Sequence, residues 1–452
     1  MLKKVLVANR GEIALRIVRA CRDLGIKAVV AYSEADQDSL AVRFADEAVC
    51  IGPATPSRSY LNPASLISAA VITGCDAVHP GYGFLAENAY FSEIVAECGL
   101  KFVGPHANAI RMMGDKASGR ATMQAAGVPI VPGSDGALIN TEHTIEMARK
   151  IGYPVMLKPS GGGGGRGMRV AFNESELVKG YQTARAEAEA AFGRGDLLME
   201  KYLPRIRHVE IQVLGDNYGN LIHLGERDCS AQRRHQKIVE ESPSPGITPE
   251  IREKMGRDAT RGVSAINYNN AGTLEFLVDP DGNYYFIEMN TRVQVEHPVT
   301  ELVSGVDIVK WQLLIAGGEP LSIRQEDVKL QGHAIECRIN AEDPERDFLP
   351  VAGKIDFYLP PGGPGVRVDS HMYTGYVPPR SYDSLLGKII TWGQDRDEAV
   401  ARMQRALQET IVAGLKTTIP FQIAMFNDPV FRSGDISTRY VAEMMERWKA
   451  AA

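Results

Sequence analysis

The stretch GTLEFLVDPDGNYYFIEMNTRVQVEHP, residues 272–298, decides how the middle of this chain folds. Its centre, DPDGN at 279–283, is typical of a turn between two strands. Alternate residues of an extended strand share one face, and from residue 288 to residue 296 the even positions are polar while the odd positions are mostly apolar. We therefore predict an antiparallel hairpin whose second strand carries one polar row, made of Glu288, Asn290, Arg292, Gln294 and Glu296.

The composition of this row favours a binding site over a solvated sheet face. Glu275 lies on the partner strand between Leu274 and Phe276, so we expect its side chain on the same face. Carboxylate and amide oxygens are the ligands that Mg²⁺ takes beside substrate phosphates. Arg292 suits the capture of a small oxyanion, and Glu296 suits proton uptake. A plain solvated face is the alternative, because alternation alone is typical of it as well.

A second signal is KPSGGGGGRGMRV, residues 158–170, where a glycine run follows a predicted strand at 154–158. Each glycine costs roughly 0.5–1 kcal/mol relative to alanine in regular structure, so the run predicts a loop. It does not fit the phosphate-loop pattern GxxxxGK[ST], and any glycine run matches GxGxxG. A flap whose backbone N–H groups approach phosphate oxygens is favoured by the adjacent Lys158, and a bare surface linker is the alternative.

We predict three parts in the chain, because 452 residues at about 150 residues per domain correspond to three domains. Residues 1–115 alternate strands and helices and predict a doubly wound parallel sheet. Residues 116–331, with a hairpin within 208–227, predict an α+β fold with antiparallel pairs. Residues 332–446, with a late helix around 397–416, predict a C-terminal α+β domain.

Composition limits the possible partners and the cell compartment. The net charge is −6, from 50 basic and 56 acidic residues, so no large basic surface for nucleic acid is expected. No stretch reaches the 18 or so apolar residues of a membrane span. The six cysteines form no CxxC pair, which argues against a zinc ribbon and fits a reducing, cytoplasmic environment.

Six motifs then occur in one order along the chain. Taken alone, the motif at 79–88 is as typical of a plain turn between strand and helix as of a ligand site, and the motif at 226–237 is more typical of a solvated charge run. The six motifs are NRGEIALRI (9–17), HPGYGFLAEN (79–88), SGGGGGRGM (160–168), ERDCSAQRRHQK (226–237), FIEMNTRVQVEHPVTE (286–301) and ECRINAEDP (336–344). Together they resemble the biotin carboxylase family of ATP-grasp proteins, and the resemblance covers about residues 1–445.

The resemblance implies a fold, an activity and partners. The central part would be an ATP-grasp fold with a mobile lid at about 131–203. The activity would be carboxylation of biotin N1 by ATP and bicarbonate through carboxyphosphate, on a separate biotin carboxyl carrier protein. A carboxyltransferase on another chain would pass the carboxyl group to acetyl-CoA, another acyl-CoA or pyruvate, and the chain would be a homodimer. The alternatives are another ATP-grasp carboxylate ligase and a non-catalytic nucleotide-binding subunit.

The resemblance also implies roles for individual residues. Two Mg²⁺ or Mn²⁺ ions would be held by Glu275, Glu288 and Asn290. Bicarbonate would lie against Lys237, Arg292, Gln294, Val295 and Glu296. Biotin would lie beside Tyr82, Gly83 and Arg338. ATP would contact Lys116, Lys158, Gly164, Gly165, Glu200, Lys201, Tyr202, Leu203, His208, Gln232 and His235. Within this set the catalytic residues would be Lys237, Arg292, Glu296 as the base, and Arg338 facing the biotin ureido group.

Overall fold

The computed structural model describes residues 1–134, 136–159, 168–192 and 195–451, apart from the side chains of residues 116, 191, 192, 450 and 451. The predicted glycine loop, with Gly164 and Gly165, therefore lies outside the described residues. Within the described ranges, no helix combines the length and the apolar character that crossing a membrane requires.

The N-terminal part is a parallel sheet with the strand order β3-β2-β1-β4-β5, which confirms the predicted doubly wound fold. Its central strand is buried on both faces, as parallel strands covered by helices usually are. The strands are β1 Lys4–Val7, β2 Lys27–Ser33, β3 Glu47–Gly52, β4 Ala77–His79 and β5 Lys101–Phe102. The helices are α1 Gly11–Asp23, α2 Leu40–Phe44, α3 Pro63–Ile72, α4 Ala89–Glu97 and α5 Ala107–Gly114.

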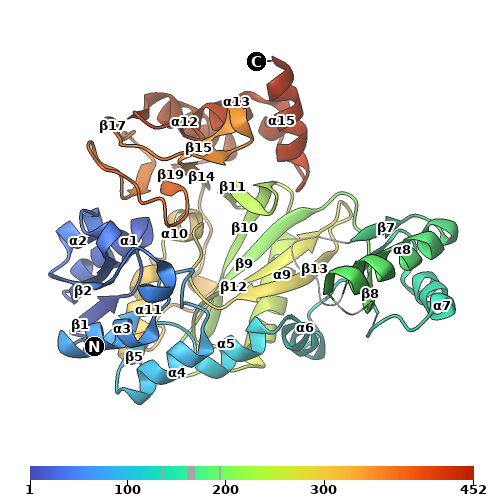
Figure 1. The fold of residues 1–452 in the computed structure, drawn as a ribbon, viewed down its shortest axis with the longest axis horizontal. Helices are drawn as coiled ribbons and strands as arrows, with labels where there is room; N and C mark the ends of the chain where they lie inside the picture. Colours follow the sequence, from blue (N-terminus) through green and yellow to red (C-terminus); the bar gives the residue numbers. More distant parts are fainter. Residues whose placement is uncertain (135, 160–167, 193–194, 452) are drawn as a thin grey trace.

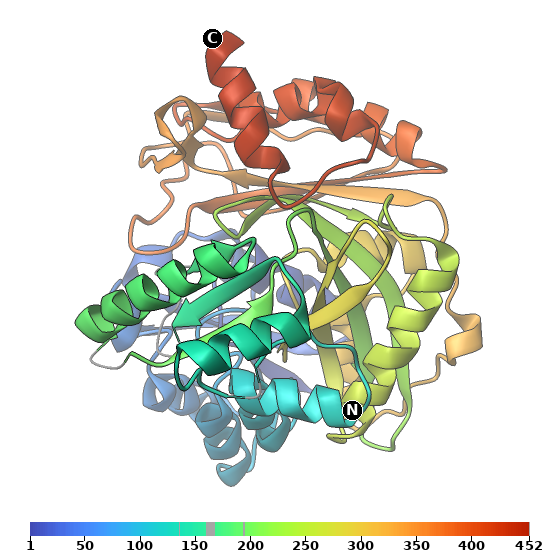
Figure 2. The ribbon, with the colours of Figure 1, turned by 90° about the vertical axis from the view of Figure 1, so that its right-hand side faces the viewer.

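The largest element is an eight-stranded antiparallel sheet in the order β13-β12-β9-β10-β11-β14-β19-β18. The first five of these strands come from the middle of the chain, and the last three come from its C-terminal part. The strands are β9 Arg207–Gly215, β10 Leu221–Arg233, β11 Gln236–Ser242, β12 Asn270–Val278, β13 Tyr284–Asn290, β14 His333–Asn340, β18 Val366–Ser370 and β19 Leu385–Gly393. The middle and C-terminal parts, whose predicted boundary is at residue 332, therefore share one sheet, because β11 pairs with β14 (Figures 1 and 2).

Helices and short strand pairs cover this sheet. The middle part contributes α6 Lys116–Ala125, α9 Pro249–Ser264, α10 His297–Ser304 and α11 Ile308–Gly317. The C-terminal part contributes α12 Arg396–Glu409, α13 Ile419–Asn427, α14 Pro429–Arg432, α15 Tyr440–Ala451 and the short strands β15 Glu342–Asp343, β16 Leu349–Pro350, β17 Phe357–Leu359 and β20 Ile411–Ala413. The C-terminal helices pack on a core that includes Ile335, Cys337 and Ile339 of β14.

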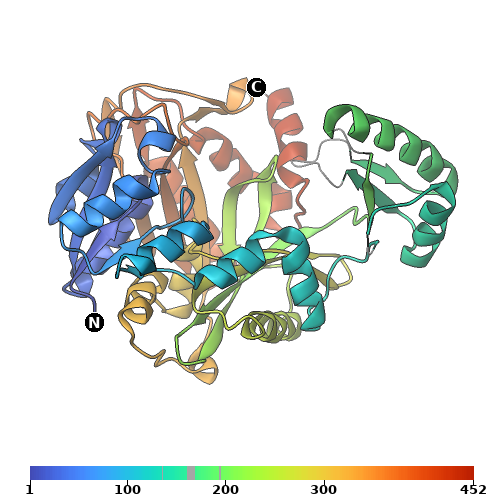
Figure 3. The same cartoon turned by 60° about the horizontal axis from the view of Figure 1, so that its bottom comes forward.

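A small separate unit lies at one end of the molecule, on the side opposite the N-terminal sheet (Figures 1 and 3). It is a three-stranded antiparallel sheet, β7-β6-β8, with two helices and its own buried core. Its elements are α7 Thr141–Ile151, β6 Val155–Pro159, β7 Arg169–Ala171, α8 Glu174–Phe192 and β8 Leu197–Lys201. This unit lies within the segment for which the family resemblance implies a lid.

Two predicted elements end earlier than expected. The strand with the polar row stops at Asn290 instead of continuing to residue 296. β13 is the edge strand of the sheet, and the N–H of Thr291 donates instead to Glu87 of the N-terminal part, at 3.0 Å. The late helix stops at Glu409, because the β-branched residues that follow pair with β17 as strand β20.

Where the C-terminal part meets the N-terminal part, His371 is buried with only 2% of its surface exposed. Its Nδ1 atom has no hydrogen-bond partner among the described residues. Burial, assisted by the nearby charge of Arg10, lowers the pKa of His371 to about 3. The folded protein therefore holds this histidine neutral, whereas the unfolded chain protonates it below a pKa of about 6.5.

We expect folding to become less stable as the pH falls below 6.5, because the unfolded state then binds a proton that the folded state cannot. For His371 the loss at pH 5 amounts to about 2 kcal/mol. In His371→Gln, the change in the urea midpoint between pH 7.5 and pH 5 should shrink accordingly. His106→Gln, at an exposed position, is the control and should keep the wild-type pH dependence. Equal pH dependence in His371→Gln and wild type would contradict the assignment.

Candidate functional site

The predicted site residues meet around the ammonium group of Lys237 on β11. Its Nζ donates to Glu210 Oε2 at 2.6 Å, to Glu296 Oε1 at 2.5 Å and to Glu275 Oε1 at 3.2 Å. Glu210 comes from β9, Glu275 from β12, and Glu296 from the residue before α10. One partly buried lysine thus contacts three carboxylates from different elements, and two of them belong to the predicted set.

Arg338 on β14 joins this group from the C-terminal part of the sheet. Its Nη2 donates to Glu296 Oε2 at 2.8 Å, and its Nε donates to Glu240 Oε1 at 2.6 Å. Glu296 therefore lies between Lys237 and Arg338 and accepts a charged hydrogen bond on each oxygen. The structure brings three of the four predicted catalytic residues into direct contact.

The fourth, Arg292, lies in the segment that follows β13 and is held in another way. Its Nε donates to Glu87 Oε2 at 2.8 Å, and its Nη2 donates to Asn290 Oδ1 at 2.7 Å. Glu87 belongs to the HPGYGFLAEN motif of the N-terminal part. The guanidinium is thus fixed between two parts of the chain, at one end of the row of acids.

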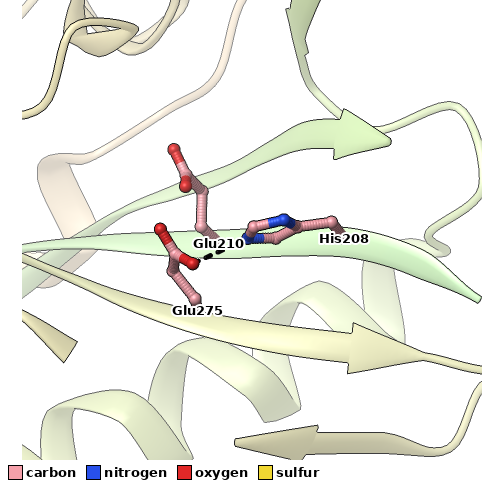
Figure 4. Close-up of side chains that lie close together, drawn as sticks. All are labelled: His208, Glu210 and Glu275. Atoms are coloured by element: carbon pink, nitrogen blue, oxygen red, sulfur yellow. Dashed lines mark ion pairs between the residues drawn. The ribbon is translucent and has the colours of Figure 1, made fainter. Parts of the chain in front are cut away.

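The predicted metal ligands also lie together. Glu275 and Glu288 are direct partners across β12 and β13, and Asn290 Nδ2 donates to Glu275 Oε1 at 3.0 Å. Figure 4 shows Glu275 beside His208 and Glu210, and the ligand atoms of these three residues all lie within 4.8 Å of one another. His208 Nε2 is 3.0 Å from Glu275 Oε2. Carboxylate oxygens from opposed strands fit a divalent cation bound beside phosphates.

The charges around Glu296 determine its protonation. Burial alone would raise the pKa of Glu296, but Lys237, Arg338 and Arg227 outweigh burial and hold this pKa well below its usual value. Burial would likewise lower the pKa of Lys237, yet its neighbours Cys229, Glu210 and Glu296 raise that pKa well above the usual value. Both groups are therefore fully charged at neutral pH. Glu296 is therefore a carboxylate that holds a proton only weakly while these cations remain bound to it.

Beneath this group, Arg227 on β10 has no exposed surface, and all of its N–H groups are used. Its five hydrogen bonds run to Glu210 Oε1 at 2.5 Å, Gln212 Oε1 at 2.8 Å, Gln294 Oε1 at 2.8 Å, Thr300 Oγ1 at 2.9 Å and Thr273 Oγ1 at 3.1 Å. Arg227 thus links β9, β10 and β12 to the segment that carries Gln294 and Glu296. Through Glu210 and Gln294, Arg227 supports the predicted residues from the buried side of the site.

Tyr82 and Gly83 lie in the loop after β4, which wraps around the side chain of Asn9. Asn9 Nδ2 donates to Pro80 O at 2.6 Å and to Tyr82 O at 2.7 Å. Gly81 between them has φ +63°, and a Cβ atom there would lie 2.9 Å from Asn9 Nδ2, so only glycine fits. The Tyr82 hydroxyl donates to Glu12 Oε1 at 2.6 Å. A cavity of about 170 Å³ adjoins this loop and is lined by both Tyr82 and Gly83.

The residues predicted to contact ATP form a second group, and part of it lies in the small separate unit. Lys158 on β6 makes an ion pair with Glu200 on β8, and Glu200 also accepts a hydrogen bond from Arg120 of α6 at 2.9 Å. Lys201 Nζ donates to Gly152 O at 2.9 Å and to Tyr153 O at 2.8 Å.

The remaining members of this group are distributed along β8, β9 and β10. Tyr202 and Leu203 follow β8, and Tyr202 packs edge-on against Phe172. Gln232 Nε2 lies 3.2 Å from His208 Nδ1. His235 is exposed in the turn between β10 and β11, with φ +67°. The side chain of Lys116, at the start of α6, lies outside the described part of the chain.

The sequence did not single out four residues that complete the site: Glu87, Glu210, Arg227 and Glu240. Glu87, Arg227 and Glu240 stand within or just after two of the quoted motifs, yet there they resemble ordinary surface charges. Glu210 lies in HVEIQVLGD, where it is the only acidic or basic residue between His208 and Asp216. That isolation is the one sequence signal that could have identified it, because a lone buried carboxylate needs a charged partner.

Known protein families match almost the whole chain. Residues 1–110 match "Biotin carboxylase, N-terminal domain", and residues 115–324 match "Carbamoyl-phosphate synthase L chain, ATP binding domain". Residues 336–443 match "Biotin carboxylase C-terminal domain".

Individual proteins match at nearly full length. The biotin carboxylase of Allochromatium vinosum is 58% identical over 446 residues, which cover 98% of this chain and 99% of that protein. A biotin carboxylase domain of a thermophilic 2-oxoglutarate carboxylase bound to bicarbonate superimposes with a TM-score of 0.94, at 52% identity over 98% of both chains. The dimer of such a domain from Hydrogenobacter thermophilus, in complex with MgADP, ADP and bicarbonate, has a TM-score of 0.88, at 53% identity over 98% of both chains.

We expect Arg227→Met to reduce the free energy of unfolding by about 3–5 kcal/mol, because it leaves buried acceptors without their charged partner. Urea denaturation followed by circular dichroism would measure the loss. Arg257→Met is the matched control, since Arg257 makes an exposed pair with Glu253 at 3.1 Å, and such a pair contributes less than about 1 kcal/mol. Similar losses in both variants would contradict the structural role of Arg227.

Proposed function

This chain belongs to the biotin carboxylase family and is an ATP-dependent ligase, and from that premise we propose that the group around Lys237 activates bicarbonate and carboxylates biotin. The observation that carries the proposal is the position of Glu296, a buried carboxylate between Lys237 and Arg338. A protein that only bound a nucleotide would have no use for a buried proton acceptor next to two cations.

The first step in this proposal is the activation of bicarbonate, which is a poor nucleophile at neutral pH. Bicarbonate binds to Arg292 and to Lys237, where it takes the place of Glu296, and Glu296 removes its proton. The resulting oxyanion attacks the γ-phosphorus of ATP, the bond to ADP breaks, and carboxyphosphate forms. Mg²⁺ or Mn²⁺ held by Glu275, Glu288 and Asn290 would neutralise charge on the phosphates.

The second step is the transfer of the carboxyl group. Carboxyphosphate breaks down to CO₂ and phosphate, and the phosphate takes the proton from biotin N1. The nitrogen then attacks CO₂ to form carboxybiotin. Loss of the N1 proton places negative charge on the ureido oxygen, and Arg338 would stabilise this charge until the attack with the Nη2 hydrogen bond now given to Glu296. Tyr82 and Gly83, on the loop held by Asn9, would line the biotin side of the site.

ATP would bind between the central sheet and the small unit that holds Lys158. Lys116, Lys158, Gly164 and Gly165 would contact the phosphates, while Glu200, Lys201, Tyr202 and Leu203 would flank the adenine. His208, Gln232 and His235 would line the rest of the nucleotide pocket. Lys158 and Glu200 satisfy each other's charge in the structure, so a phosphate group would compete with Glu200 for this lysine.

The proposal extends to partners, location and domain bounds. The biotin would be carried by a separate carrier protein, a carboxyltransferase on another chain would complete the reaction, and the chain would act as a homodimer, as in the related dimer structure. A cytoplasmic location is supported by six free cysteines. The domains would span 1–115, 116–331 with a lid at about 131–203, and 332–446.

Glu296→Ala and Arg338→Ala should each reduce biotin-dependent ATP cleavage by at least about 100-fold, because each removes a group that acts on a reacting atom. ADP release would be measured with and without bicarbonate and biotin. Undiminished cleavage in both variants would contradict the roles assigned to these residues. Cleavage by the wild type that needs neither bicarbonate nor biotin would instead indicate a ligase for another carboxylate or a nucleotide-binding subunit.

Glu87→Gln should raise the KM for bicarbonate about three- to tenfold, because Arg292 loses its charged anchor while the amide keeps the shape. The KM for biotin should stay unchanged, since Arg338 does not contact Glu87. Glu93→Gln, which removes an exposed pair with Arg111 on the same part of the chain, is the control. An unchanged KM for bicarbonate in Glu87→Gln would contradict the proposal that Glu87 positions Arg292 for bicarbonate.

A further inference from the structure

Two buried carboxyl groups face each other where the middle part of the sheet meets the C-terminal part. Glu240 on β11 and Glu336 on β14 are direct partners across the strand pair, and neither has any exposed surface. Side chains in such positions have Cβ atoms about 4.5–5.5 Å apart. Arg338 lies two residues after Glu336 on the same strand, so its side chain leaves the sheet on the same face.

Only one of the four carboxyl oxygens of this pair accepts a hydrogen bond from a described residue. Glu240 Oε1 accepts from Arg338 Nε at 2.6 Å and lies 2.5 Å from Arg338 Nη2. Glu240 Oε2 and both oxygens of Glu336 have no hydrogen-bond partner among the described residues. A buried acceptor without a partner costs about 1–3 kcal/mol. Three such atoms therefore lie on two adjacent acids.

Among the described residues, no cation makes a hydrogen bond or an ion pair with Glu336. The ammonium group of Lys388 on β19 donates to Val295 O at 2.6 Å and lies 3.1 Å from Glu12 Oε1. Arg338 is shared between Glu240 and Glu296. The charged groups that act on Glu336 are thus Lys388 and Arg338, which are engaged elsewhere, and the carboxylates Glu240 and Glu296, which repel a second negative charge.

One proton on this pair would satisfy two of the three unpaired oxygens. If Glu336 carries it, its O–H can donate to Glu240 Oε2, so that one hydrogen bond replaces an unpaired oxygen on each acid. Burial raises the pKa of Glu336 well above its usual value, and burial raises the pKa of Glu240 to about 7, each against an opposing cation. Both pKa shifts favour the neutral acid, and a hydrogen bond between the two carboxyl groups requires only one of them to be neutral. The shifts therefore agree with the unpaired oxygens.

We propose that Glu240 and Glu336 share one proton and that this carboxyl pair positions Arg338 for biotin. The inference rests on the proposed role of Arg338 at the ureido oxygen. When Glu296 takes up the bicarbonate proton it loses its charge, and Glu240 becomes the remaining anionic anchor of Arg338. A Glu240 side chain fixed by the Glu336 hydroxyl cannot rotate with the guanidinium, so Arg338 stays aimed at the substrate.

The shared proton can be tested without any turnover. The infrared spectrum of wild-type protein minus that of Glu336→Gln at pH 7 should contain the C=O stretch of a protonated carboxylic acid. Absence of this band from the difference would overturn the proposal. The result does not depend on what Arg338 does, so it separates a failure of this inference from a failure of the proposed function.

The positioning role predicts a contrast between two variants of Glu336. The amide of Glu336→Gln can donate to Glu240 as the acid does, and the KM for biotin should stay within about twofold of wild type. Glu336→Leu cannot donate, and we expect its KM for biotin to rise about tenfold while its KM for ATP is unchanged, which also shows that the variant is folded. Equal KM values for biotin in the two variants would overturn the positioning role of Glu336. If Glu336→Leu fails to fold, the infrared difference still tests whether Glu240 and Glu336 share a proton.

Discussion

The site depends on one ion pair that is sealed from water, the contact between Arg227 and Glu210. Both side chains have no exposed surface, and the second oxygen of Glu210 holds Lys237. From Lys237 the contacts continue to Glu296 and on to Arg338, so that positive and negative groups alternate. Losing one member would leave a buried charge without its partner, a loss that costs far more than an exposed pair contributes. This alternation explains how so many ionised groups remain inside a folded sheet.

The same contacts control how strong a base Glu296 is. In the structure, hydrogen bonds from Lys237 and Arg338 stabilise its charged form, and its pKa is low, so it would hold a proton only weakly. In the proposed reaction both donors turn toward substrates, Lys237 to bicarbonate and Arg338 to biotin. Glu296 then loses the two interactions that lower its pKa, and its affinity for a proton rises. Its basicity would therefore increase only when the substrates are in place, which limits unproductive proton uptake in the empty site.

The hairpin at 272–298 and the alternating N-terminal part were predictable because their signals are local. Turn residues, strand alternation and helical spacing act over a few neighbours, and the sheets have the expected types. The end of β13 was not predictable in this way, because it depends on Glu87, which contacts Thr291 from a distant part of the chain. A period-two pattern continues past Asn290, but the backbone leaves the strand where its N–H finds a partner elsewhere.

Arg227 shows why part of the candidate site escaped the sequence. It shares a charge run with Arg233 and Arg234, and nothing in residue type distinguishes the three. Arg227 is fully buried with five hydrogen bonds, whereas Arg234 is exposed and pairs with Asp347. The difference arises from β9 and β12, whose acceptors surround one arginine and not the other. A role that depends on tertiary partners of this kind has no signature in the run itself.

The position of Arg338 depends finally on strand register. β14 meets β11 with Cys337 opposite Val239 and Glu336 opposite Glu240, so the apolar partners enter the C-terminal core while the acids and Arg338 face the site. A slip of one residue would turn every side chain to the other face, placing Arg338 in that core and Cys337 beside Glu296. Such a slip would bury the guanidinium of Arg338 without a partner, which is costly. The alternation of polar and apolar residues along β14 therefore fixes its register against β11. Because reacting groups must be placed to within about 1 Å to be effective, the pairing that joins two parts of the chain is itself a requirement of the chemistry.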